Sequence, residues 1–132
     1  MSPDVVKKKL AAIAGYLDDL RPHEKISFDG FIGRHYEIER ILELLIVTAS
    51  DLVLHLITSR GEPAPSSYRA VFQRAGELGL LSPALSRNLA LSAGLRNILA
   101  HEYDEIDYAV LHKSIPAALR DFSALIEELS RL

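Results

Sequence analysis

The sequence contains no cysteine, which excludes a disulfide framework and any metal site built on thiolates. It also has no uncharged apolar run of roughly eighteen residues, the length that a membrane-spanning helix needs. Its first nine residues carry charge where the apolar part of a signal peptide would begin. These absences predict a cytoplasmic protein that has no disulfides and does not enter a membrane.

Positive charge is also in short supply, because 15 lysines and arginines face 18 acidic residues and give a formal net charge of −3. Binding of nucleic acid by the whole surface depends on neutralising phosphates, so this balance argues against it and leaves room only for local contact with RNA. With 132 residues, of which 48% are hydrophobic and 25% charged, the chain has the composition of a globular protein. We expect a single domain over residues 1–132.

Apolar residues recur at intervals of three and four along most of the chain, which is the pattern of amphipathic helices. No segment shows the period of two that is typical of strands. The pattern predicts five helices, at residues 6–20, 31–60, 68–78, 83–99 and 108–129. Because the connections between them are short, we expect an all-α, up-and-down helical bundle.

Polar residues and prolines mark the helix ends. Ser66 is the expected cap of the third helix, and Ser82 that of the fourth, with Pro83 in its first turn. Asp104 or Asp107 is expected to cap the last helix, which Pro116 should bend. The apolar face of the second helix is too long for one short neighbour to cover, so we expect it to pack against a second copy of the chain in a homodimer.

The fourth helix ends in a cluster of chemically active side chains, namely Arg96, Asn97, His101 and Tyr103. Arginine offers a permanent planar cation that fits phosphate oxygens, and histidine titrates near neutral pH, so together they suit cleavage of a phosphodiester. Arg96 and His101 are five residues apart and point roughly 140° from each other on a helix. A second subunit carrying the same motif would complete a symmetric cleft.

The stripe through Ala90, Gly94, Asn97 and His101 indicates close approach at this face, because a glycine costs roughly 1 kcal/mol in a helix interior and usually has a packing or access reason. A purely structural interpretation is also open. An arginine at a helix end often pairs with an acid, a histidine there interacts with the helix dipole, and a tyrosine covers the core.

Asp51 and His55 lie four residues apart on the second helix and could begin a metal site. Two ligands are too few, and a hydrogen-bonded role in helix packing is favoured, so no metal and no cofactor are expected. The separate histidines at positions 23, 35 and 112 are expected to be solvated.

The segment Arg96-Asn97-Ile98-Leu99-Ala100-His101-Glu102-Tyr103 resembles the signature of the HEPN ribonucleases, in which an arginine and a polar residue precede a histidine. Tyr103 and the segments 49–57 and 65–68 resemble the HepT branch, the toxins of two-gene modules. The resemblance implies an all-helical homodimer that cuts RNA without a metal at its dimer interface, with Arg96 and His101 catalytic and Asn97 supporting them. It also implies a type VII toxin–antitoxin module whose partner, a minimal nucleotidyltransferase antitoxin, transfers AMP to Tyr103.

A different class of function remains open, namely a non-catalytic helical binding module or a partner subunit of a nucleotidyltransferase. Such a protein would bind its partner but would not cut RNA.

Overall fold

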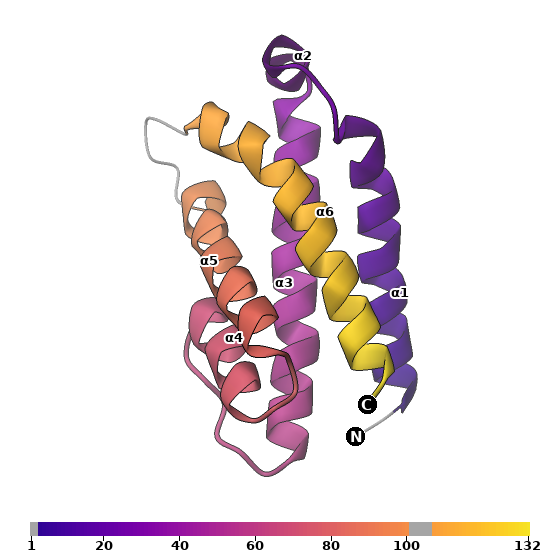
Figure 1. The fold of residues 1–132 in the computed structure, drawn as a ribbon, viewed down its shortest axis with the longest axis vertical. Helices are drawn as coiled ribbons and strands as arrows, with labels where there is room; N and C mark the ends of the chain where they lie inside the picture. Colours follow the sequence, from indigo (N-terminus) through magenta and orange to yellow (C-terminus); the bar gives the residue numbers. More distant parts are fainter. Residues whose placement is uncertain (1–2, 101–106) are drawn as a thin grey trace.

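Helices account for most of residues 3–100 and 107–132, the part of the chain that the computed structural model describes. Side chains are described for residues 4–95 and 107–132. Within this part there is no strand, so the all-α prediction is confirmed. The helices, drawn in Figure 1, are α1 (Pro3–Leu20), the 3₁₀ turn η1 (Arg21–His23), α2 (Phe28–Gly33), α3 (His35–Ser59), α4 (Tyr68–Glu77), α5 (Pro83–Ala100) and α6 (Tyr108–Ser130).

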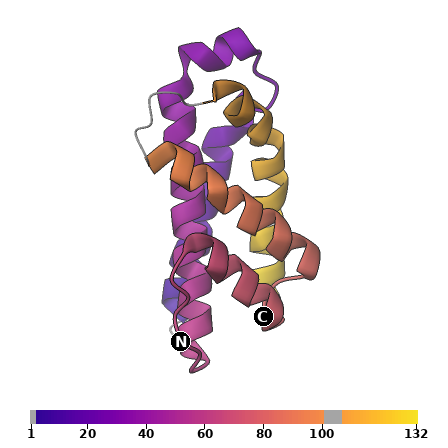
Figure 2. The ribbon, with the colours of Figure 1, turned by 90° about the vertical axis from the view of Figure 1, so that its left-hand side faces the viewer.

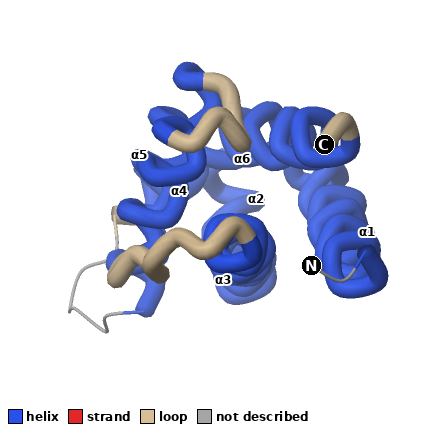
Figure 3. Tube along the Cα trace, turned by 90° about the horizontal axis from the view of Figure 1, so that it is seen from below, coloured by secondary structure: helices blue, strands red, loops and turns tan. Residues whose placement is uncertain are grey.

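The four longer helices, α1, α3, α5 and α6, run alternately up and down, as the short connections predicted (Figure 1). Viewed from below, α3 lies beside α4 and α5 on one side and α1 on the other, with α6 across from it (Figure 3). The short helix α4 packs against α5 and α3, and α2 lies at the end of the bundle where α3 and α6 begin (Figures 1 and 2).

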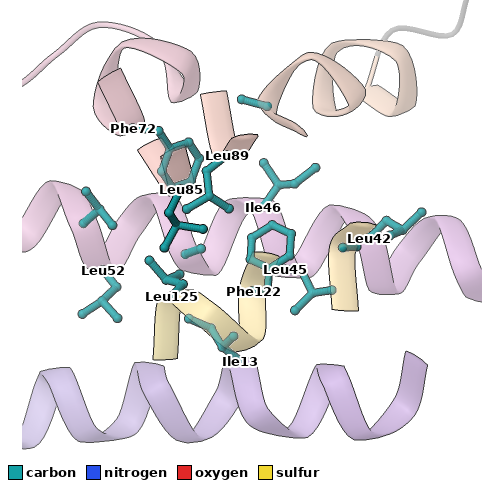
Figure 4. Packing of buried hydrophobic residues seen from close by; sticks show 14 of the residues in the cluster. Ile13, Leu42, Leu45, Ile46, Leu52, Phe72, Leu85, Leu89, Phe122 and Leu125 are labelled. Carbon is teal, nitrogen blue, oxygen red and sulfur yellow. The ribbon is translucent and has the colours of Figure 1, made fainter. Parts of the chain in front are cut away.

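The core lies between these helices and uses the apolar positions that the periodicity identified. Ile13 of α1, Leu45 of α3 and Phe122 of α6 are almost completely buried, and side chains from α4 and α5 close the core from the other side (Figure 4). Burial of this kind stabilises a helix by about 1.5–3 kcal/mol for each large apolar side chain, far more than helix propensity does.

The prediction of one continuous helix over residues 31–60 is wrong, because the chain breaks at Arg34. This residue has φ −130° and ψ 18°, and it separates the six-residue α2 from the 25-residue α3. Two glycines in α2, Gly30 and Gly33, weaken helix propensity at the break. Phe31 and Ile38 are both fully buried and are seven residues apart, so the apolar spacing passes across the break unchanged.

Three helix caps follow the expected chemistry, with one shift in position. Ser67, not Ser66, caps α4, because its hydroxyl accepts a hydrogen bond from the Ala70 amide at 3.0 Å. Ser82 caps α5 as predicted, and Asp107 caps α6 by accepting from the Val110 amide at 3.2 Å. Asp104, the other predicted cap, lies outside the described residues. Helix α6 continues through Pro116.

Helix α3 is long and apolar enough to cross a membrane, judged by length and composition alone. However, 56% of its most apolar window is buried inside the bundle, as expected for a central core helix.

Candidate active site

Helix α5, which carries the start of the Arg96 to Tyr103 motif, is attached to α6 at two points. At its N-terminus, the Glu128 carboxylate accepts hydrogen bonds from the Ser82 amide at 2.7 Å and the Ser82 hydroxyl at 2.9 Å. Two turns further along, the Asn88 side-chain amide donates to Asp121 at 3.3 Å. The Asp121 carboxylate is only 4% exposed, so this polar contact fixes the register between the two helices.

The structure places the backbone of Arg96 and Asn97 in the last turns of α5, as the sequence predicted. Their side chains, and the whole of His101 and Tyr103, lie outside the described part of the structure. The predicted convergence of Arg96 with His101 therefore stays a prediction.

The face of α5 that leads to the motif is open. Gly94 is exposed, and apart from its chain neighbours and the adjacent backbone of α5, no described atom lies within 4 Å of the position that a Cβ would take there. Packing against the described part of the chain is therefore not the reason for this glycine. The expected approach of a second molecule to this face stays a prediction.

On the other side of the motif, the chain enters α6 beside a cluster of rings. Tyr108 lies 4.9 Å from the His35 ring and 6.3 Å from the Phe31 ring, measured between centroids. The Nδ1 atom of His35 is 3.0 Å from a carboxylate oxygen of Glu39, and these two side chains are only 18% and 14% exposed. A half-buried imidazole paired with a carboxylate is an arrangement that catalytic and structural sites share.

The expectation that the three separate histidines are solvated is wrong. His23 is buried near Glu37, and Nε2 of His112 lies 2.6 Å from the Ile26 carbonyl oxygen. Each of these rings contacts a residue distant in the sequence, which helical spacing does not reveal. His35 is different, because Glu39 lies four residues later and that spacing could have indicated the pair.

Asp51 and His55 do not form a site together. Asp51 is exposed and lines a hollow between α3 and the start of α4, together with Ser67. His55 is half-buried, and its Nε2 atom has no hydrogen-bond partner in the described part of the chain, so the expected hydrogen-bonded packing role is wrong for this atom there. Among the described residues, no three histidines or acids come together as metal ligands.

Comparison with known proteins finds similarity along nearly the whole chain. A family model described as Ribonuclease HepT-like matches residues 13–129. The tRNA nuclease HepT of Aphanizomenon flos-aquae is 29% identical over 133 residues, covering 98% of this chain and 90% of that protein. The mRNA nuclease HepT of Shewanella oneidensis is 30% identical over 77 residues, which is 58% of each chain.

Solved structures share the fold. The tri-AMPylated Shewanella oneidensis HEPN toxin in complex with MNT antitoxin superimposes with a TM-score of 0.88 at 22% identity, covering 99% of this chain and 100% of that one. A toxin–antitoxin structure with AMP-PNP gives a TM-score of 0.87 at 21% identity, with coverage of 98% and 99%. The family match spans most of the helical bundle described above, and the chain belongs to the HepT-like ribonuclease family.

Proposed function

We propose that the protein is a metal-independent endoribonuclease and the toxin of a type VII toxin–antitoxin module. The observation that carries this proposal is the Arg96 to Tyr103 motif at the end of α5 in a chain of the HepT-like ribonuclease family. Relatives named tRNA nuclease and mRNA nuclease support RNA as the substrate.

In the proposed reaction, the ribose 2′-hydroxyl attacks the adjacent phosphorus, and the bond to the 5′-oxygen breaks. One His101 imidazole accepts the proton of the 2′-hydroxyl, and the His101 of a second subunit donates a proton to the leaving 5′-oxygen. Arg96 stabilises the negative charge that develops on the phosphorane through its two parallel N–H groups. Asn97 orients His101 or the phosphate from one turn away. The products are a 2′,3′-cyclic phosphate and a free 5′-hydroxyl.

A homodimer would bring the two motifs into one cleft. The open face of α5 at Gly94 supports this arrangement, because nothing in the described part of the same chain covers it. Symmetric pairing would place Arg96 of one subunit near His101 of the other and so overcome their divergence on a single helix.

The proposed partner is a minimal nucleotidyltransferase antitoxin that transfers AMP to Tyr103. Support comes from the similar fold of a tri-AMPylated HEPN toxin solved with its MNT antitoxin. AMP at Tyr103 would add bulk and negative charge where the RNA phosphate has to bind. We place the module in the cytoplasm, where RNA and ATP are available.

The test is cleavage of RNA by the purified protein and by its His101→Ala variant, with Lys113→Ala at an exposed position of α6 as the control. We expect the wild type and the control to cut in the presence of a chelator and to leave cyclic phosphate ends. His101→Ala should fold but lose at least a hundredfold in rate, on the order of a general acid–base contribution. Undiminished cutting by His101→Ala would overturn the assignment, and a protein that binds its partner but cuts no RNA would be the non-catalytic module.

A further inference from the structure

Two arginines on neighbouring helices, Arg69 of α4 and Arg87 of α5, have no hydrogen-bond or ion-pair partner in the described part of the chain, and both line one hollow. Apart from Arg60, the other arginines with described side chains all pair with acids. These paired arginines are Arg21, Arg34, Arg40, Arg74, Arg120 and Arg131. Because the chain has a net negative charge, it is unusual for two guanidinium groups without a described acidic partner to line the same pocket.

The hollow lies between α4 and α5, and we call it the α4–α5 groove. Its described lining includes Arg69, Gln73 and Glu77 from α4 and Arg87, Ala90 and Leu91 from α5. Glu77 is the acidic residue of this lining, and its carboxylate forms an ion pair with Arg74 at 3.2 Å. Arg74 also binds Glu62, and the hydrogen bond to Glu62 is the main cause that raises its pKa. Arg74 is one cation shared between two carboxylates, so Glu77 keeps part of its negative charge. Arg69 and Arg87 still outnumber this one acid, and the described lining of the groove has a net positive charge.

The two helices pack closely near the turn that joins them. The Ser86 hydroxyl donates to the Phe72 carbonyl oxygen at 2.7 Å, and a Cβ at Gly76 would lie 2.6 Å from the Ser86 Cβ. The chain changes direction between α4 and α5, so the two helices are antiparallel (Figure 2). The first turn of α4 therefore lies nearer the end of α5 than its last turn does. Arg69 consequently lies toward the end of the groove that leads to the motif.

The same face of α5 continues from the groove to the motif. Arg87, Leu91 and Gly94 follow one another at helical spacing, and all three are exposed, Leu91 by 71%. The backbone position of Arg96 lies about 180° around the axis from that of Arg87, whereas Asn97 follows Gly94 by three residues and is nearer this face. At a rise of 1.5 Å per residue, the backbone of Asn97 is about 15 Å along the axis from that of Arg87. This length corresponds to several nucleotides of a polynucleotide strand.

We propose that the α4–α5 groove binds the sugar–phosphate backbone of the RNA strand several nucleotides away from the bond that is cut, with Arg69 and Arg87 contacting phosphates. The guanidinium fork matches phosphate oxygens, Gln73 offers a further donor, and the exposed side chain of Leu91 offers an apolar surface to a base or ribose. An acidic protein segment would fit the charge too, but the continuity of this face with the motif favours RNA. This inference rests on the proposed function, because it places the groove beside a site that cuts RNA.

The test measures RNA binding separately from cutting. Arg69→Gln, Arg87→Gln and the double variant are prepared both with an intact motif and with His101→Ala, which prevents cutting. The control is Arg60→Gln, which removes an equally unpaired arginine outside the groove. The probe is a fluorescein-labelled, unstructured single-stranded RNA of about 20 nucleotides, followed by anisotropy at several salt concentrations.

We expect each single groove variant to raise the Kd for this RNA about tenfold and to reduce the salt slope by about 0.7, and the double variant to show a larger effect on both. Arg60→Gln should stay within about twofold of its parent. Groove variants that bind and cut like Arg60→Gln would overturn the proposal, and so would variants that keep RNA binding but lose binding to the antitoxin. A wild type that binds RNA through the two arginines without cutting it would refute the proposed function alone, whereas a wild type that neither binds nor cuts refutes both.

Discussion

The carboxylate of Glu128, near the end of α6, binds both the backbone amide and the hydroxyl of Ser82 at the start of α5. The same hydroxyl accepts a hydrogen bond from the Leu85 amide at 3.3 Å, so one residue of α6 supports the cap of the helix that carries the motif. A residue 46 positions away in the sequence thus helps to determine where α5 begins.

We predict that Glu128→Ala lowers the free energy of unfolding by about 1–2 kcal/mol, because the Ser82 amide loses its acceptor and the cap loses its support. The matched control is Glu127→Ala at the adjacent position, which removes only an exposed ion pair with Arg131 and should cost less than about 1 kcal/mol. Urea denaturation measures both. Equal effects of the two variants would contradict a special role for Glu128.

We predict opposite effects for alanine at two helical glycines. Gly76→Ala should destabilise the protein by about 1–3 kcal/mol, because the new Cβ would collide with Ser86 across the α4–α5 contact. Gly15→Ala in α1 meets no atom within 4 Å and should stabilise by about 0.5–1 kcal/mol through helix propensity. Thermal unfolding distinguishes them, and adding Ser86→Gly to Gly76→Ala should recover part of the loss.

Two histidines offer a second contrast. We predict that His55→Leu raises the free energy of unfolding by about 1 kcal/mol, because it removes the buried Nε2 atom, which has no partner among the residues whose side chains are described. His112→Leu should lower it by a similar amount, because Nε2 of His112 lies at hydrogen-bond distance from the Ile26 carbonyl oxygen. If both variants destabilise the protein in urea, a partner for His55 exists that the described residues do not provide.

The fold was largely predictable, because helical periodicity and capping chemistry are local. The pattern located the apolar faces of α1, α4, α5 and α6. It missed the break at Arg34 because Phe31 and Ile38 keep a helical spacing across it. It also placed the cap of α4 one residue early, since two consecutive serines, Ser66 and Ser67, offer the same side chain.

The surroundings of the candidate site were much less predictable. The sequence placed Arg96 and Asn97 near the end of a helix, and their backbone does lie in the last turns of α5. The ring cluster of His35 with Tyr108 and the contact between Asn88 and Asp121 join different helices. Such contacts depend on how helices pack, and the spacing within one helix does not contain that information.

At the motif itself, we predict that Arg96→Lys lowers kcat by about 10²–10³ while the substrate KM changes little. Lysine keeps the charge but loses the two parallel donors that fit a phosphorane. The control is Arg60→Lys, which makes the same exchange outside the motif and should leave both constants unchanged. Steady-state cleavage of a fluorogenic RNA measures kcat and KM separately. A change in KM alone would assign Arg96 to substrate binding.

We predict that Tyr103→Phe still cuts RNA but escapes AMP transfer by the antitoxin, because the phenol oxygen is the proposed acceptor. Incubation with the partner and ATP, followed by mass spectrometry of the intact protein and its peptides, measures the modification. Tyr108→Phe, a few residues further on, is the control and should be modified like the wild type. AMP found on Tyr103→Phe in undiminished amount would refute the acceptor assignment.

Helix α2 has only six residues, yet its Phe31 is completely buried against Tyr108 and His112 at the end of the bundle. A helix this short has no appreciable stability in isolation. Its amide protons are therefore protected only while the aromatic ring of Phe31 stays in place, and we expect them to exchange with solvent before those of α3. Local unfolding would then begin beside the first turn of α6, which exposes this corner to proteases before the long helix α3 opens.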